Sequence, residues 1–186
     1  MKRRDAAALM LAAVAMPLRA SEGAAALTPE LRAALPQAEL AGQATLSFWG
    51  FEVYRARLWV APGFKSSDYA KHNFALELIY LRDFSGADIA SRSIKEMRRQ
   101  GPMAAGQEAG WETQMRTLFP DVKTNQRITG IHQVGRGAVF LYNGQPLGEI
   151  RDPTFAKLFF GIWLAPQTSE PRMRSSLLGA AAAEAP

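Results

Sequence analysis

The sequence predicts an α+β domain in which an antiparallel sheet is covered by helices on one face. The first observation is the order of the patterns: strands come first, then two helices, three further strands and two final helices. Grouping of this kind favours an antiparallel sheet over alternating βαβ units. The second observation is the dipeptide Asn143-Gly144, which predicts a tight hairpin because both central positions of a type I′ turn need positive φ.

A short helix and a hairpin are expected at the start of the domain. Thr28 is a suitable N-cap, and Pro36 ends this helix, which we place at the periphery. Residues 44–49 alternate loosely between apolar and polar side chains, and the glycine that follows permits a tight turn into a strand over residues 50–60. A third strand is expected over residues 74–81.

Strand 50–60 has two faces of different character. From residue 53 its side chains alternate, which places them on opposite sides of a sheet. The two faces consist of Tyr54, Ala56, Leu58 and Val60 and of Val53, Arg55, Arg57 and Trp59. The second face is either an ordinary solvated surface or the floor of a site for an anion.

Two helices are expected after the third strand. Ser85 is a typical N-cap with Asp88 three residues later, and the first helix ends before the Gly-Pro pair at residues 101–102. The second helix is expected from about Gln107 to Leu118, with its apolar face toward the core.

Three strands and two helices complete the domain. Strands are expected over residues 127–133, 138–142 and 147–150. Asp152 and Pro153 then begin a helix whose apolar residues recur at i, i+3, i+4, i+7 and i+8, which is typical of a core-facing stripe.

The last helix is expected to be capped near Thr168 or Ser169 and to end at Gly179. The remaining residues, 180–186, are rich in alanine and are expected to form a disordered tail.

The N-terminus is typical of a secretory signal peptide. Lys2, Arg3 and Arg4 precede an apolar run over residues 6–18, and cleavage is expected near Ala20. The protein is therefore expected in the periplasm or outside the cell. The predicted division of the chain is a signal peptide, an N-terminal extension, one domain and a tail, over residues 1–20, 21–37, 38–179 and 180–186.

The rest of the composition excludes several classes of protein. No later segment is apolar over the roughly 18 residues that a membrane helix needs, and no run of basic residues indicates a nucleic-acid surface. The chain has no cysteine, which excludes thiolate metal sites and thiol nucleophiles. His72 and His132 have no second ligand at suitable spacing, so neither a metal nor another cofactor is expected. Nothing in the sequence indicates the oligomeric state.

Four dispersed segments carry a family resemblance. They are residues 50–60 (GFEVYRARLWV), the strand-to-helix passage ending at Ser85, the hairpin 138–144 (AVFLYNG) and residues 152–171 (DPTFAKLFFGIWLAPQTSEP) with the closing LLG. Together they make residues 38–179 similar to the bacterial, exported branch of the chalcone isomerase-like proteins. This resemblance implies an open-faced β-sandwich, a long antiparallel sheet backed by helices with a ligand cleft between them.

The resemblance leaves the activity open, because plant proteins of this fold either close a flavanone ring or bind fatty acids without catalysis. The enzymes carry an arginine on the strand before the hairpin, whereas residues 42–46 contain none. Their threonine on the next strand corresponds to Arg55. Their helix tyrosine and asparagine correspond to Phe84 and to Ser91 or Arg92. Efficient chalcone cyclisation is therefore not expected.

Arg55, Arg57 and Tyr54 are the candidate ligand-binding residues. The resemblance implies that their strand lines the cleft, where the guanidinium groups of Arg55 and Arg57 would hold an acidic group. Tyr54 adds a hydrogen-bond donor only if the strand twists or bulges, because it points to the opposite face.

Two other groups of residues are explained without a role in function. Arg92, Lys95 and Arg98 recur at helical spacing, as expected for a solvated helix face. The large aromatic residues either line an apolar pocket or pack in the core. They are Trp111, Phe159, Phe160 and Trp163.

The function expected from these observations is non-catalytic binding of a small apolar or phenolic ligand with an acidic group, such as a fatty acid or a phenolic acid. Two alternatives stay open. One is an intramolecular lyase or isomerase that uses a changed polar set, and the other is a periplasmic interaction or assembly factor.

Overall fold

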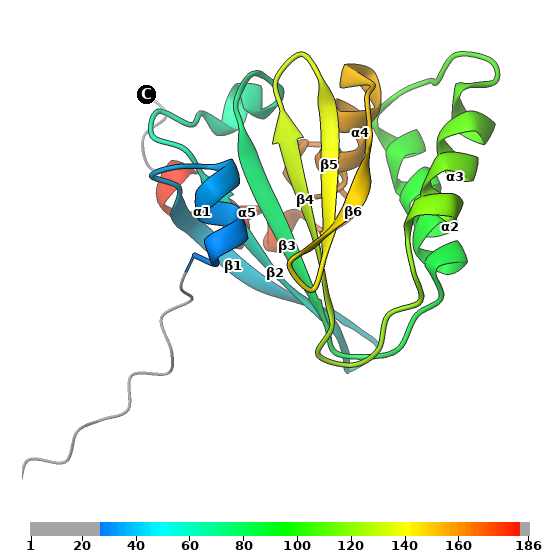
Figure 1. Ribbon diagram of the computed structural model, residues 1–186, viewed down its shortest axis with the longest axis horizontal. Helices are drawn as coiled ribbons and strands as arrows, with labels where there is room; N and C mark the ends of the chain where they lie inside the picture. The colour runs from blue at the N-terminus through cyan, green and yellow to red at the C-terminus, as the bar shows by residue number, and fades with distance from the viewer. Residues whose placement is uncertain (1–26, 183–186) are drawn as a thin grey trace, which may run out of the picture.

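A single antiparallel sheet is the centre of the molecule. The computed structural model describes residues 27–182, and its six strands pair in chain order (Figure 1). The strands are β1 (Glu39–Phe48), β2 (Phe51–Val60), β3 (Phe74–Tyr80), β4 (Arg127–Gln133), β5 (Gly137–Tyr142) and β6 (Gln145–Ile150). The predicted antiparallel sheet is confirmed. β1 begins earlier than expected, because its first residues, ELAGQ, do not alternate in polarity.

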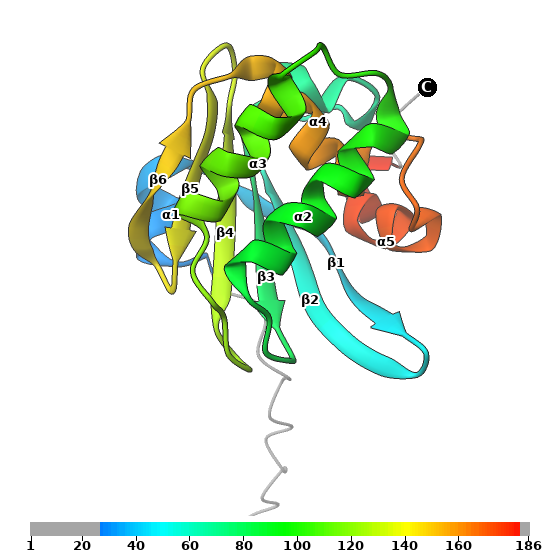
Figure 2. The same cartoon turned by 90° about the vertical axis from the view of Figure 1, so that its right-hand side faces the viewer.

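Four longer helices cover one face of the sheet, which we call the inner face (Figures 1 and 2). They are α2 (Gly86–Met97), α3 (Gln107–Leu118), α4 (Pro153–Leu164) and α5 (Pro171–Ala182). α4 and α5 lie against the strands, whereas α2 packs on α3 and α4. The predicted α+β arrangement with helices on one face is confirmed.

Local capping explains where α2 and α4 begin. The Ser85 hydroxyl accepts a hydrogen bond from the Asp88 N–H, and Asp152 accepts from Thr154 and Phe155. Both caps agree with the prediction. For α5 the predicted cap, Thr168 or Ser169, was too early, because the helix begins at Pro171.

The start of α5 differs because Thr168 forms a turn of its own. Its hydroxyl donates to the carbonyl oxygen of Ile162 and accepts from the N–H of Glu170, so the helix begins only at Pro171. α5 is interrupted at Gly179, which lies at φ 20° and ψ −105°. The predicted signal peptide and the last part of the predicted tail, from residue 183, lie outside the described residues.

The core between the sheet and the helices is rich in aromatic rings. Alternate residues of β3, among them Phe74 and Leu76, point to the inner face and are buried. Phe74 meets Phe160 of α4 edge to face, with ring centroids 4.9 Å apart. Each such buried ring stabilises the fold by about 1.5–3 kcal/mol.

A short helix packs on the opposite, outer face. α1 (Pro29–Ala34) begins at Thr28, as predicted, and Leu31 is 1% exposed. Leu31 packs in a second cluster with Trp59 and Ile131 of the sheet. The expectation of a peripheral helix was wrong, because Leu31 and Leu35 cover apolar outer-face side chains of four strands, β2 to β5.

A histidine side chain is enclosed in the inner core. His132 is 3% exposed, and its ring stacks on Phe74 with centroids 4.9 Å apart. Its Nδ1–H donates to the carbonyl oxygen of His72 at 2.7 Å. Burial lowers the pKa of His132, because the imidazolium ion would lose its hydration.

The protein is therefore expected to lose stability as the pH falls through the range where histidine titrates. The unfolded chain takes up a proton near pH 6.5 while folded His132 stays neutral, so the unfolded state binds more protons and the free energy of unfolding decreases. Urea denaturation at about pH 7.5 and pH 5.5 measures this change. His132→Phe should remove most of it and His72→Gln should retain it. An equal loss of stability in His132→Phe would contradict the assignment.

Candidate functional site

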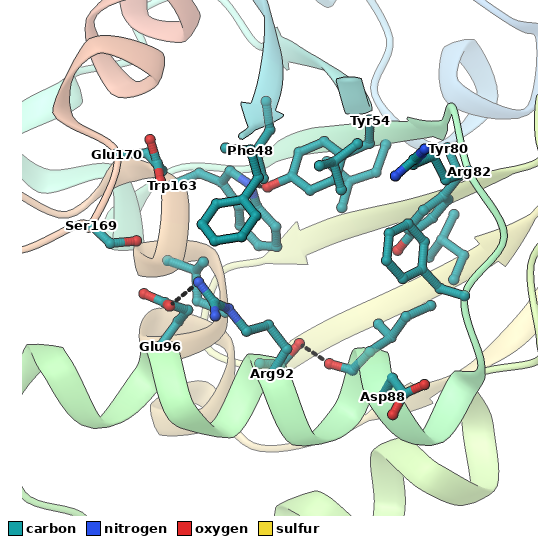
Figure 3. Close-up of a pocket in the computed structure, with 18 of the residues that line it drawn as sticks. Phe48, Tyr54, Tyr80, Arg82, Asp88, Arg92, Glu96, Trp163, Ser169 and Glu170 are labelled. Atoms are coloured by element: carbon teal, nitrogen blue, oxygen red, sulfur yellow. Dashed lines mark hydrogen bonds and ion pairs between the residues drawn. The ribbon is translucent and has the colours of Figure 1, made fainter. Parts of the chain in front are cut away.

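A cavity of about 790 Å³ lies between the inner face of the sheet and helices α2 and α4. This volume falls within the range of about 300–1,000 Å³ that is usual for ligand pockets. Most of its lining side chains are apolar, among them Leu46, Leu78, Ile89, Phe159 and Ile162. The cavity exists because α2 packs on the neighbouring helices and leaves space above β1–β3 (Figure 3).

A β-bulge shapes the part of β2 that lines the cavity. Leu46 pairs with Tyr54, whereas the next residue of β1, Ser47, pairs with Glu52, so Val53 has no partner. An extra residue of this kind bends the strand and redirects side chains. Val53 and Tyr54 are consecutive, yet both line the cavity.

The Tyr54 hydroxyl group is an enclosed polar group on the sheet side of the cavity. Trp163 of α4 donates a hydrogen bond from Nε1 to the Tyr54 oxygen at 2.9 Å. Burial raises the pKa of Tyr54, which the Trp163 hydrogen bond and the charge of Arg92 oppose. The phenol therefore stays neutral at physiological pH, and its O–H remains a donor.

Tyr80 provides a second phenol beside the first. The two rings meet edge to face with centroids 6.2 Å apart, and burial also raises the pKa of Tyr80. Among the residues that the structure describes, no acceptor receives either O–H group. Each hydroxyl is thus available to a ligand in the cavity.

An ion pair lies on the helix side of the cavity. Arg92 of α2 points toward the sheet and contacts Glu96 one turn later at 2.8 Å (Figure 3). The Arg92 side chain is 63% exposed, whereas that of Glu96 is 8% exposed. The second oxygen of Glu96, Oε2, lies 3.7 Å from Arg99 and has no hydrogen-bond partner. Arg92 is therefore the member of this pair that a ligand can reach from the open side of the cavity.

The structure reverses the expected orientation of β2. Tyr54 lines the cavity, whereas Arg55 and Arg57 lie on the outer face and are not among the residues around the cavity. Arg57 forms an ion pair with buried Glu77 at 3.2 Å, and Arg127 contacts the other Glu77 oxygen at 3.6 Å. The alternation was correct from Tyr54 onward, whereas Val53 was predicted on the face of Arg55 and lines the cavity instead, because of the bulge. The sequence also does not say which face meets the helices.

The remaining candidates divide between cavity and core. Of the four large aromatic residues, Phe159 and Trp163 line the cavity, and the other two pack in the core. Arg92 lines the cavity too, although its spacing suggested a solvated face, and Lys95 is exposed as expected. The sequence analysis did not identify the face of α2 that lines the cavity, which contains Ile89, Ser93 and Glu96. This face is too polar to be recognised as a cavity wall from its sequence.

The described part of the chain offers no group of three or more potential metal ligands. None of its helices combines the length and the hydrophobicity needed to span a bilayer.

The sequence profile of the chalcone isomerase-like family matches residues 23–179. The chain belongs to this family. The match begins ahead of the predicted domain start at residue 38 and includes α1. An uncharacterised protein of Haemophilus influenzae is 30% identical over 132 residues, which is 70% of this chain. The chain spans 63% of the length of that relative.

A solved structure has the same fold. The Arabidopsis thaliana fatty-acid binding protein AtFAP1 superposes with a TM-score of 0.63 over 80% of this chain and 90% of that protein. The two sequences are 11% identical, so the likeness concerns the fold alone. The arrangement of sheet and helices described above is thus the chalcone isomerase-like fold.

The positions that the resemblance matched with catalytic residues of chalcone isomerases lie on both faces. Phe84 and Arg92, the latter matched as an alternative to Ser91, line the cavity, whereas Arg55 lies on the outer face. The cavity therefore has a polar set of its own, which includes Tyr54, Tyr80 and the Arg92–Glu96 pair. Its other polar lining residues are Arg82, Asp83, Asp88, Ser93, Ser169 and Glu170.

Proposed function

We propose that this exported protein binds a small, largely apolar ligand with an acidic group, of the fatty-acid or phenolic-acid type, in the cavity and does not convert it. The observation that carries the proposal is the combination of two neutral phenol donors with the guanidinium groups of Arg82 and Arg92 in a cavity whose lining is mostly apolar. The carboxylates on the lining, Asp83, Asp88, Glu96 and Glu170, are the groups that an acidic ligand has to avoid. Family membership and the fold shared with a fatty-acid binding protein support a binding role.

The acidic group of the ligand is held between the sheet and α2. A carboxylate accepts hydrogen bonds from Tyr54 and Tyr80, whose O–H groups have no other acceptor among the described residues. Arg92 turns from Glu96 toward the carboxylate, while Arg99 remains beside Glu96. Charge-assisted hydrogen bonds of this kind are roughly twice as strong as neutral ones.

The apolar part of the ligand fills the space between α2, α4 and the sheet. Side chains of all three line this space, among them Ile89, Ile162 and Leu78. Burial of the ligand chain against them contributes about 0.8 kcal/mol for each CH₂ group. The cavity thus selects for an apolar body and an acidic end.

The cavity does not offer the polar set with which chalcone isomerases stabilise charge on the enone oxygen. The residues that the resemblance places there are Phe84, whose side chain has no polar atom, and Ser91 or Arg92, of which Arg92 lines the cavity and is paired with Glu96. We therefore expect the protein to accelerate the loss of naringenin chalcone by less than about tenfold over buffer, which is under about 1.4 kcal/mol of barrier. A larger acceleration would favour an intramolecular lyase.

The proposal predicts a bound acid in the protein as the cell produces it. Native mass spectrometry of protein isolated from the periplasm should give a one-to-one complex, and the chain mass should correspond to cleavage near Ala20. Delipidated protein should bind palmitate or p-coumarate with the same stoichiometry. An empty cavity that also rejects both acids would overturn the binding function, and a full-length chain mass would overturn export.

A further inference from the structure

The end of the β1–β2 hairpin exposes three large aromatic side chains. Phe48, Trp49 and Phe51, which we call the aromatic tip, are 66%, 85% and 57% exposed. Figure 2 shows this end of the hairpin projecting beyond the helices. Contiguous exposed apolar surface is unfavourable in water and commonly marks a site of interaction.

The backbone holds the tryptophan at the apex in an unfavourable conformation. Trp49 and Gly50 form the two-residue turn, with φ values of 52° and 79°. Glycine adopts positive φ freely, whereas a bulky side chain is strained there. The structure thus carries an exposed tryptophan at a position where a glycine or an asparagine would make a better turn.

The aromatic tip continues directly into the cavity. All three of its residues also line the cavity, together with Val53 and Tyr54 further along β2. An apolar ligand that enters beside the tip passes along aromatic surface from solvent to the interior.

Two cations flank the aromatic tip. The guanidinium carbon of Arg82 lies 4.5 Å from the centre of the Phe51 ring, and Arg55 lies four residues further along β2 on the outer face. Neither of them forms an ion pair within the described residues. Glu52 lies at the tip and is exposed, and the carboxylate of Asp83, next to Arg82, is paired with Lys123. Aromatic rings with neighbouring arginines are typical of the water–lipid interface, where the rings insert and the cations meet phosphate groups.

We propose that the aromatic tip docks the protein on a phospholipid surface, with Arg55 and Arg82 at the phosphate groups and the cavity mouth facing the lipid. A protein partner fits less well. A stable protein interface buries about 800 Å² on each side, whereas three partly exposed rings of about 150–250 Å² each offer about half of that. Docking does not depend on which ligand the cavity holds.

The position of the tryptophans gives a direct test. Trp49 is the exposed one, whereas Trp59, Trp111 and Trp163 are 3%, 3% and 7% exposed. Delipidated protein is mixed with vesicles of phosphatidylcholine, with or without phosphatidylglycerol, and binding is measured by co-sedimentation. Tryptophan fluorescence should shift to the blue and should be quenched by brominated acyl chains.

The variants separate docking from other effects. Trp49→Ser and Phe48→Ser should each weaken vesicle binding by about tenfold or more. Val134→Ser is the matched control, because Val134 is 45% exposed at the opposite end of the sheet and should bind as the parent does. Arg82→Gln should weaken binding to the vesicles that contain phosphatidylglycerol.

Three results would overturn docking. They are wild-type protein that does not sediment with either kind of vesicle, tip variants that bind as tightly as the wild type, and a tip that instead mediates self-association. Palmitate titration without vesicles tests the proposed function separately, so either proposal can fail while the other stands.

Discussion

Replacing Arg92 by alanine is expected to weaken the binding of palmitate by about tenfold to a hundredfold. A hydrogen bond to a charged group contributes about 1.5–3 kcal/mol, and each 1.4 kcal/mol is a factor of ten in affinity. The Arg92 side chain is 63% exposed, so its removal should leave the fold intact. Isothermal titration calorimetry of the delipidated variant gives the change in Kd.

Three comparisons make this result specific. Hexadecanol has the same chain without the charge and should lose little affinity in Arg92→Ala. Lys95→Ala, on the same helix but away from the cavity, and Arg55→Ala, on the outer face, should bind palmitate as the parent does. Equal affinity of Arg92→Ala for palmitate would exclude Arg92 as the partner of the acid.

Replacing Glu96 by glutamine is expected to strengthen the binding of palmitate. Glu96→Gln removes the carboxylate that pairs with Arg92 at 2.8 Å, so Arg92 becomes free to contact the ligand. Part of the loss in Arg92→Ala arises because Glu96 then repels the acid, and the double variant Arg92→Ala, Glu96→Gln measures this part.

The fold was predictable because its signals are local. Ser85, Asp152 and the Asn143-Gly144 pair each determine a cap or a turn with neighbouring residues, and the structure places the elements accordingly. The alternation of β2 predicted its two faces correctly from Tyr54 onward. Packing of α1 was not predictable, because it depends on outer-face side chains that come together only in the sheet.

The site was less predictable because it depends on the choice of face and on one irregularity. Arg57 of β2 pairs with Glu77, which lies directly opposite it on β3, and no local sequence pattern predicts that pairing. The bulge at Val53 turns two consecutive side chains into the cavity, which strict alternation forbids. Arg92 becomes a cavity residue only through the placement of α2.

Gly42→Ala is expected to destabilise the protein by about 1–3 kcal/mol or more, because β1 and α5 touch there through their backbones. A Cβ atom on Gly42 would overlap the carbonyl oxygen of Ser176 and lie 2.6 Å from that of Leu177. Neither oxygen can rotate away as a side chain would. α5 must therefore shift, although Leu177 and Leu178 anchor it in the core at 0% and 2% exposure.

Gly110→Ala is the matched control, because a Cβ atom on this residue of α3 meets nothing within 4 Å. Alanine is favoured over glycine inside a helix by roughly 0.5–1 kcal/mol, so this variant should gain stability where Gly42→Ala loses it. Urea denaturation followed by circular dichroism gives both changes. A Gly42→Ala variant as stable as the parent would mean that α5 packs on β1 more loosely than the structure has it. Because α5 follows the loop that carries Ser169 and Glu170 at the cavity, a shift of α5 should also lower the affinity for palmitate.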